Sequence, residues 1–340
     1  MEVVPLATGA AIVLALVFAF TNGFHDAANA VAASVSTRAI SPRAALAMAA
    51  GLNLLGALLG TQVALTIGSG ILEAGDVSGA EGLVVVAAGL LGAISWNVVT
   101  WWLALPSSSS HALIGAVAGA GMAVGADVHW ERLTGAVLVP MAAFPLLGFA
   151  TAWGLTVGLR RWLAARPYHS TMRRFRLLET VASALTALGH GLQDAQKSMG
   201  VMLIALGAGG YLELEGAAAQ VPAWVRLSAA AALGAGTWAG GARIIRTLGS
   251  RIARLDASQG FVAQAVTASI LYVAAFGMAA PVSTTHTVSA AIAGAGGARR
   301  MRRLQWGTLR RIGFAWLATL PAAGAIGALV CRLLLGALTA

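Results

Sequence analysis

The 340-residue sequence is poor in charge, in cysteine and in lysine. Charged residues make up only 10 % of it, whereas a soluble domain carries about a quarter, so an ordinary soluble protein is excluded. The one cysteine, Cys331, leaves neither a disulfide framework nor a set of cysteine ligands for a metal. The one lysine, Lys197, stands in an apolar stretch, where an ionised group must pair, face a cavity or carry function.

Apolar residues dominate the chain instead. They account for 58 % of it, and several apolar stretches reach about 20 residues, the length that crosses a bilayer core as a helix. Glycine is abundant, with 42 residues, as in closely packed membrane helices, and the alternation typical of a membrane barrel is not visible. Residues 5–20 lack a basic start and a clear cleavage site, so they are interpreted as a first span and not as a signal peptide. The chain is therefore predicted to be an all-α polytopic membrane protein.

The net charge of +10 is unevenly spread. Eighteen of the 22 basic residues lie in four clusters, at 38–43, 160–176, 243–254 and 299–311. Acidic loop residues lie between them, at 73–81, 127–131 and 213–215. Because basic loops face the cytoplasm, we expect a multi-pass protein of the plasma (inner) membrane, with both termini outside and the central basic loop cytoplasmic. This topology explains the basic residues better than a nucleic-acid surface does, so no nucleic-acid partner is expected.

The charge pattern divides the chain into two halves around the basic loop at 160–176. The first half, 1–159, has predicted segments at 3–37, 44–68, 82–105, 108–125 and 134–159. The second half, 177–340, has them at 177–209, 223–245, 259–279, 284–298 and 312–337. The first segment of each half is expected to be interrupted, near 22–29 and near 190–197, and the short fourth segment to form a helical hairpin. Since the halves run in opposite directions, we predict an inverted-topology repeat of two five-segment halves, with about 10–12 transmembrane segments, as in secondary transporters.

Two hydroxyl-rich stretches occupy the same place in the two halves. They read Pro106-Ser107-Ser108-Ser109-Ser110-His111 and Pro281-Val282-Ser283-Thr284-Thr285-His286, and Gly-Ala-Gly begins eight residues after each histidine. Proline suits the first turn of a helix, and the free N–H groups of that turn make an anion site together with the hydroxyls. The alternative is that the hydroxyls only bond the preceding turn or join helices. We favour one oxyanion site, in which both helix starts meet near the bilayer midplane.

A second repeated motif centres on Asp26 and Asp194, the only aspartates in predicted spans. The two copies read Asn22-Gly23-Phe24-His25-Asp26-Ala27-Ala28-Asn29 and His190-Gly191-Leu192-Gln193-Asp194-Ala195-Gln196-Lys197. Asp194 and Lys197 are three residues apart, so they can pair on one helix face. Each aspartate could merely cap or tie a helix, but two at equivalent places favour a functional site.

Other polar and small residues have structural explanations. Three GxxxG patterns are predicted helix-packing surfaces that would also permit a homodimer, at Gly56–Gly60, Gly115–Gly119 and Gly236–Gly240. We expect Glu179, beside the basic loop, to pair with an arginine. Asn53 and Asn97 either bond across helices or line a transport path, and both alternatives stay open.

The linked motifs resemble those of the inorganic phosphate transporter (PiT) family, in its bacterial low-affinity type. The resemblance rests on both aspartate motifs, both hydroxyl stretches and Gly240–Gly249, and it covers nearly the whole chain. It implies a symporter whose hydroxyl stretches hold phosphate and whose motif aspartates serve the coupling cation. Two departures affect the cation sites: Gln193 stands where the family commonly has asparagine, and Gln264 where it often has glutamate. His25 beside Asp26 is similar to the proton-coupled bacterial members, and histidine titrates near neutral pH, so we favour H⁺ over Na⁺.

We therefore expect a secondary active transporter that works by alternating access and moves inorganic phosphate with a cation, and not an enzyme. The candidate phosphate ligands are Ser108, Ser109, Ser110, Ser283, Thr284 and Thr285. The candidates for the coupling cation or proton are Asp26, Asp194, Asn22, Asn29, Gln193 and His25, with Asp26 and Asp194 as the metal ligands if Na⁺ is coupled. The expected supporting residues are Lys197, His111, His190 and His286.

Two other functions are considered. A transporter of sulfate or another tetrahedral oxyanion is the first, because hydroxyl groups accept either anion. A membrane phosphotransferase or phosphatase is a remote second, because neither a P-loop type of phosphate cradle nor a soluble catalytic domain is visible. No cofactor is expected. The expected partners are phosphate, free or as a metal–phosphate complex, its co-transported H⁺ or Na⁺, and the lipid bilayer.

Overall fold

The computed structural model describes residues 3–68, 78–212, 220–240 and 242–339, and every regular element among them is a helix. The acidic loops predicted at 73–76 and 213–215 lie outside the described residues. The first half contains α1 (Val3–Ser36), α2 (Pro42–Ala57), α3 (Gln62–Gly68), α4 (Gly79–Trp102), α5 (Ser109–Val124), α6 (Trp130–Leu133) and α7 (Val139–Leu163). The second half contains α8 (Tyr168–Ala208), α9 (Ala223–Ala239), α10 (Ala242–Arg246), α11 (Ala257–Tyr272), α12 (Thr284–Gly297) and α13 (Trp306–Thr339). The all-α fold class is confirmed.

The predicted interruptions near 22–29 and 190–197 are wrong, because α1 and α8 run unbroken through both aspartate motifs. Asn22 and Asn29 bond to side chains of other elements and do not compete for the backbone of their own helix, so α1 continues through them. The breaks lie in the next segment of each half. The first separates α2 from α3 with a 71° bend. The second is at Gly240, whose backbone is extended and lies so close to the Phe24 backbone that a Cβ would clash with it.

The two hairpins that carry the hydroxyl stretches are built alike. Ala104 and Ala279 each stand two residues before the motif proline, and both adopt a positive φ, of 54° and 48°. This conformation is strained for alanine, and it turns the chain between α4 and α5 and again between α11 and α12. The repeated strain indicates that both turns are fixed by their surroundings.

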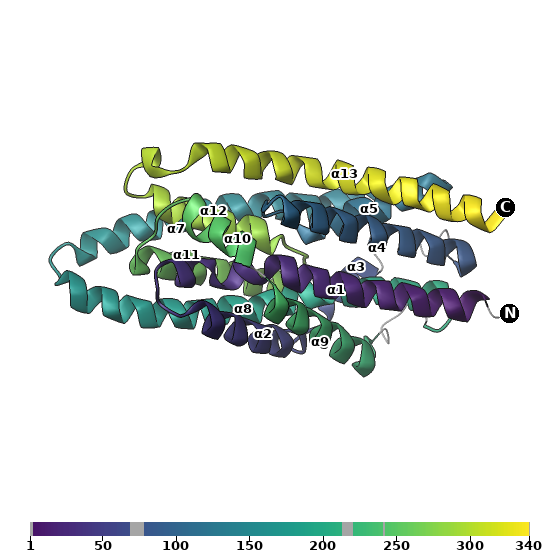
Figure 1. The fold of residues 1–340 in the computed structure, drawn as a ribbon, viewed down its shortest axis with the longest axis horizontal. Helices are drawn as coiled ribbons and strands as arrows, with labels where there is room; N and C mark the ends of the chain where they lie inside the picture. Colours follow the sequence, from purple (N-terminus) through teal and green to yellow (C-terminus); the bar gives the residue numbers. More distant parts are fainter. Residues whose placement is uncertain (1–2, 69–77, 213–219, 241, 340) are drawn as a thin grey trace.

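The helices pack in a pattern that is nearly unchanged when the halves are exchanged. α1 packs on α9 as α8 packs on α2, α5 packs on α13 as α12 packs on α7, and α4 packs on α1 as α11 packs on α8. Figure 1 shows α1 and α8 running in opposite directions, with both termini at one end of the bundle and the turn between α7 and α8 at the other. The division into two inverted repeats stays a prediction that this packing supports.

The five segments predicted in each half are all helical. Among the described residues, α1, α4, α7, α11 with its π-helical extension to Gly277, and α13 are long and apolar enough to cross a membrane, and the bent α2–α3 pair makes a sixth. The total of about 10–12 transmembrane segments stays a prediction.

All three GxxxG patterns pack within the chain. Gly56 lies against the backbone of α8, Gly115 and Gly119 against α13, and Gly236 and Gly240 against α1. In these places a Cβ would meet a backbone carbonyl, so only glycine allows the helices to approach this closely. The predicted packing role is confirmed. The homodimer stays a prediction, and these glycines are not free to form its interface.

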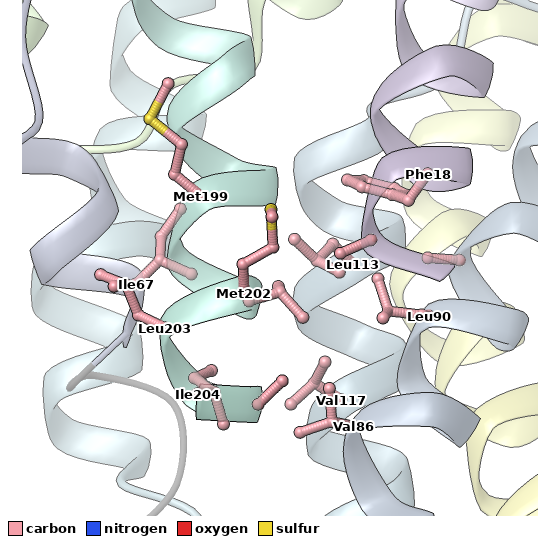
Figure 2. Close-up of a cluster of buried hydrophobic side chains, with 14 of the residues drawn as sticks. Phe18, Ile67, Val86, Leu90, Leu113, Val117, Met199, Met202, Leu203 and Ile204 are labelled. Atoms are coloured by element: carbon pink, nitrogen blue, oxygen red, sulfur yellow. The ribbon is translucent and has the colours of Figure 1, made fainter. Parts of the chain in front are cut away.

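An apolar cluster fills the bundle between the aspartate motifs and the end that carries the termini. Figure 2 shows Met202 of α8 facing Leu113 of α5, with Phe18 of α1 and Leu90 of α4 beside them and Met199 on the other side of α8. Each of these five side chains is fully buried. Since Phe18 precedes Asp26 on α1 and Met199 follows Asp194 on α8, the cluster closes the polar centre off from that end.

Candidate functional site

The starts of α5 and α12 lie together at the centre of the bundle. Ser108 and Ser283 are the N-cap residues, and each side-chain oxygen accepts a hydrogen bond of 3.2 Å from the backbone N–H of the following histidine. Ser110 Oγ donates to the carbonyl of Val282 at 3.4 Å, which joins the two stretches. The expectation that both helix starts meet at one place is therefore confirmed by the packing.

Asp26 of α1 lies between the two hydroxyl stretches. Ser109 Oγ donates to Asp26 Oδ2 at 3.4 Å, and Thr285 Oγ1 donates to Asp26 Oδ1 at 3.3 Å. One turn further along α1, Asn29 Nδ2 donates to Thr285 Oγ1 at 3.0 Å and to Thr284 Oγ1 at 3.4 Å. One carboxylate thus binds hydroxyls from both halves of the chain.

Three different groups lie close to the carboxylate of Asp194 of α8. Lys197 Nζ donates to Asp194 Oδ1 at 2.7 Å, and Asn22 Nδ2 donates to Oδ2 at 3.3 Å. His190 Nε2 lies 3.1 Å from Oδ2, an ion-pair distance without hydrogen-bond geometry. The predicted pairing of Lys197 with Asp194 is confirmed.

Lys197 also links the two aspartate centres. Its Nζ donates to Ser109 Oγ at 3.5 Å, and that hydroxyl in turn donates to Asp26. Two carboxylates and one ammonium leave this connected cluster with one net negative charge when the histidines are neutral. All three charged side chains are at most 1 % exposed.

The ring of His190 is oriented by a chain of bonds from a neighbouring helix. Thr237 Oγ1 donates to the Leu233 carbonyl and accepts from Asn53 Nδ2 at 2.8 Å, so the Asn53 Oδ1 atom faces His190 Nδ1 at 3.1 Å. An amide oxygen accepts only, so His190 carries its proton on Nδ1. In the neutral ring the lone pair of Nε2 then faces Asp194.

This orientation makes a candidate cation position. The lone pair of His190 and the carboxylates of Asp26 and Asp194 offer ligand atoms that all lie within 4.8 Å of one another. Three acceptors that face each other repel unless a cation lies between them or one of them is protonated. Asn22 Oδ1 and Asn29 Oδ1, both buried and without a partner, are further oxygens on the same helix as Asp26.

His25 faces a separate hydroxyl pair. Its Nδ1 lies 2.6 Å from Asp26 Oδ1, and its Nε2 lies 3.2 Å from Thr100 Oγ1. Ser107 Oγ donates to Thr100 Oγ1 at 2.8 Å and also approaches His25 Nε2 at 3.5 Å. Ser107 gives its one hydroxyl proton to Thr100, and Thr100 donates its own to the carbonyl of Trp96 at 2.9 Å, so both hydroxyl oxygens are acceptors beside His25 Nε2.

Three predicted residues lie beside the cluster and not in it. Gln193 Nε2 donates to the carbonyls of Leu271 and Ala280, which ties α8 to the hairpin of α12, while its Oε1 has no partner. The rings of His111 and His286 lie 4.8 Å apart, and His286 stacks on Trp316 of α13. These three side chains position the helix starts, and no contact joins them to either aspartate.

The sequence did not single out Thr100, Ser107 and Thr237 as site residues. Thr100 and Ser107 lie next to His25, and Thr237 reaches His190 through Asn53. The spacing of these residues in the sequence does not reveal such contacts. Asn53 bonds across helices, which decides between its two predicted roles. The expected arginine partner of Glu179 is wrong: within the described part of the chain Glu179 bonds to Thr37, and no arginine lies within ion-pair distance.

The centre is closed on all sides. Every predicted phosphate and cation residue, from Asn22 to Thr285, is at most 1 % exposed. The structure thus describes an occluded arrangement, and a ligand can reach it only after helices move.

Comparison with known proteins identifies the relatives. Residues 22–327 match the model of the phosphate transporter family. The chain belongs to this family.

Two curated relatives are similar to this chain over nearly their whole length. A "Probable low-affinity inorganic phosphate transporter" of Rhizobium meliloti (strain 1021) is 43 % identical over 333 residues, which cover 96 % of this chain and 95 % of the relative. A protein of the same description from Bacillus subtilis (strain 168) is 38 % identical and covers 97 % of both chains. The family and these relatives are transporters and not enzymes, which confirms that prediction.

A solved structure supports the fold. "The sodium-dependent phosphate transporter" superposes with a TM-score of 0.85 at 22 % identity, over 98 % of this chain and 99 % of the other. At this identity the likeness shows the shared fold alone.

Proposed function

We propose that this chain is a symporter of inorganic phosphate and a cation in the plasma membrane, and that it works by alternating access. The relatives' descriptions support the substrate. The observation that carries the proposal is the position of Asp26, whose carboxylate binds hydroxyls of both helix starts.

Phosphate in this proposal binds between the starts of α5 and α12. Ser109, Ser110, Thr284 and Thr285 supply hydroxyl donors, and the first-turn N–H groups add a positive potential. Ser108 and Ser283 use their oxygens as caps, and their hydroxyl protons are available to the anion. Lys197, already bonded to Ser109, is the cation nearest to this position.

Charge explains why a cation accompanies the anion. The two aspartates and Lys197 carry one net negative charge, and phosphate adds one or two more in a centre that is shielded from water. Burying unpaired charge costs several kcal/mol or more. A co-bound cation at Asp26 and Asp194 offsets this cost.

The proton is the favoured coupling ion. His25 lies 2.6 Å from Asp26, and its other ring nitrogen faces the hydroxyl oxygens of Thr100 and Ser107. Na⁺, with Asp26, Asp194 and the free amide oxygens of Asn22 and Asn29 as ligands, is the second candidate. A metal–phosphate complex would use the same carboxylates, and no resident cofactor is proposed.

In this proposal residues 1–159 and 177–340 are inverted repeats. They exchange conformations when the transporter passes from the state open to one side of the membrane to the state open to the other. The near-symmetric helix packing supports this exchange. The end that carries the basic loop 160–176 is assigned to the cytoplasm, because that loop holds six of the 22 basic residues. Both termini, at the opposite end in Figure 1, are then outside.

Uptake of labelled phosphate into proteoliposomes tests the proposal, with pH and Na⁺ gradients imposed separately. We expect uptake driven by the pH gradient and abolished by Asp26→Asn with Asp194→Asn. Glu131→Gln, at an exposed acid in α6, serves as the control. Failure of the wild type to take up phosphate overturns the proposal, as does full uptake by the double variant. Uptake that is driven only by Na⁺ would overturn the assignment of H⁺ as the coupling ion but not the rest of the proposal. Stronger competition by sulfate than by unlabelled phosphate would show that the substrate is sulfate and not phosphate.

A further inference from the structure

Glu179 is a buried acid that the proposed mechanism does not use. It lies on α8, fifteen residues before Asp194 and so about 22 Å from it along the helix. Its side chain is 0 % exposed. Oε2 accepts a hydrogen bond of 2.7 Å from Thr37 Oγ1, just after α1, and Oε1 has no hydrogen-bond partner among the described residues.

The carboxyl group fits into a gap that a glycine leaves open. A Cβ built on Gly260, in the first turn of α11, would overlap Glu179 Oε1. The carboxyl therefore contacts three elements at once: its own α8, the end of α1 through Thr37, and the start of α11 through Gly260. All three meet at the end of the bundle that carries the loop 160–176.

The charged groups around Glu179 do not neutralise it. Arg176, on its own helix, and Asp256, the N-cap of α11, are the charged residues whose fields reach it, and their signs oppose each other. Thr37 of α1 contributes a neutral hydroxyl. An ionised carboxylate with one hydrogen bond in this position is costly, whereas the protonated acid is not. Within the described residues the cluster of metal-binding side chains is elsewhere, at Asp26, His190 and Asp194, so the cation that suits this site is a proton.

We propose that Glu179 is a proton-binding latch at this end of the transporter. With a proton on Oε1, the neutral carboxyl remains in the gap beside Gly260 and holds α1, α8 and α11 together. When the proton leaves to water at this end, the carboxylate leaves the gap to become hydrated, and the three helices separate. Because α1 and α8 carry Asp26 and Asp194, their separation opens a path from the centre to this end. The transport consequence rests on the proposed function, but the latch itself does not.

The near absence of cysteine allows a direct test. In a Cys331→Ala background, Ser183→Cys places a thiol one turn from Glu179 toward the centre, at a side chain that is 0 % exposed. The rate of labelling by a water-soluble thiol reagent is measured in detergent over a pH series. Each rate is divided by that of Ser170→Cys, an exposed position at the start of the same helix, to remove the reactivity change of the thiol itself.

We expect the normalised labelling rate to rise about tenfold per pH unit while the closed form dominates, as for release of a single proton. Glu179→Gln keeps the acceptor for Thr37 but cannot ionise, so its labelling should stay low at every pH. Gly260→Ala keeps the acid but fills the gap, so its labelling should stay high at every pH. Size-exclusion elution as one species shows that each variant is folded.

Labelling of Glu179→Gln that rises with pH as in the parent overturns the latch, and so does parent labelling that is flat. Neither result affects phosphate uptake by the wild type, so a failed latch and a failed transport proposal remain distinguishable. If Na⁺ at fixed pH lowers labelling in the parent but not in Glu179→Gln, the site binds Na⁺ and the proton assignment is overturned.

Discussion

Replacement of Lys197 by methionine tests the charge arrangement at the centre of the bundle. Methionine matches the length of the lysine stem but lacks the ammonium group. In the wild type, Lys197 Nζ lies 2.7 Å from Asp194 Oδ1 and 3.5 Å from Ser109 Oγ, and both charged side chains are buried. The substitution leaves Asp194 with Asn22 and His190 as its remaining close neighbours among the described residues.

The expected loss of stability follows from the buried charge left behind. Removing one partner of a buried ion pair costs about 3–5 kcal/mol, because the other charge is left uncompensated. Replacing both partners by neutral groups is often close to neutral. We therefore expect Lys197→Met to lower the free energy of unfolding by about 3–5 kcal/mol, and Asp194→Asn with Lys197→Met to recover most of that loss.

The assay is a double-mutant cycle on the purified protein, with thermal or denaturant unfolding as the readout. Phosphate uptake is measured on the same preparations. Neither variant should transport, since the double variant lacks both the cation ligand and the ammonium group. A single variant that loses less than about 1 kcal/mol, or a double variant no more stable than the single one, would refute the ionised pair.

Three further predictions concern individual contacts. Thr285→Val removes the hydroxyl that donates to Asp26 and should weaken phosphate binding about tenfold to a hundredfold, whereas Thr285→Ser keeps the hydroxyl and should keep the affinity. Equal phosphate affinities of Thr285→Val and the wild type, measured by calorimetry, would contradict this prediction. His25→Gln keeps a polar partner for Thr100 but cannot titrate, so the pH dependence of uptake should flatten, and an unchanged pH profile would remove His25 from the coupling. Gly236→Ala drives a Cβ into the Phe20 carbonyl and should cost about 1–3 kcal/mol in unfolding experiments. Gly154→Ala in α7, with open space around it, should not destabilise; equal losses would show that helix propensity, not close packing, sets the effect.

The sequence predicted the segments better than their breaks. Long apolar stretches and a proline before hydroxyls are local signals, and they placed the starts of α5 and α12 correctly. Polar residues at 22–29 were misread as a break, because a buried polar residue looks the same in sequence whether it interrupts a helix or bonds to a neighbouring one. The real break at Gly240 depends on the close approach of Phe24 from α1, which is a tertiary contact.

The candidate site shows the same division. The repeated motifs are sufficient to predict that Asp26, Asp194 and the hydroxyl stretches belong to one site. The partners that orient them, Thr100 for His25 and Asn53 for His190, depend on which way each helix faces. Glu179 was expected to pair with an arginine because basic residues are near it in sequence, but it faces away from them, into the bundle.

The contacts of Asp26 give an atomic reason for the coupling that we propose. Ser109 and Thr285 each have a single hydroxyl proton, and both protons are donated to Asp26 in this structure. Phosphate can accept those protons only if Asp26 gives them up, and a proton or Na⁺ on Asp26 removes the demand for them. Cation binding therefore frees the donors that the anion needs, and by linkage phosphate must strengthen cation binding by the same factor. We expect phosphate affinity in the wild type to change about 5- to 150-fold with the concentration of the coupling ion. Asp26→Asn, whose amide does not bind a cation as a carboxylate does, should bind phosphate with an affinity independent of that ion; an unchanged ion dependence in calorimetry would show that the coupling resides elsewhere.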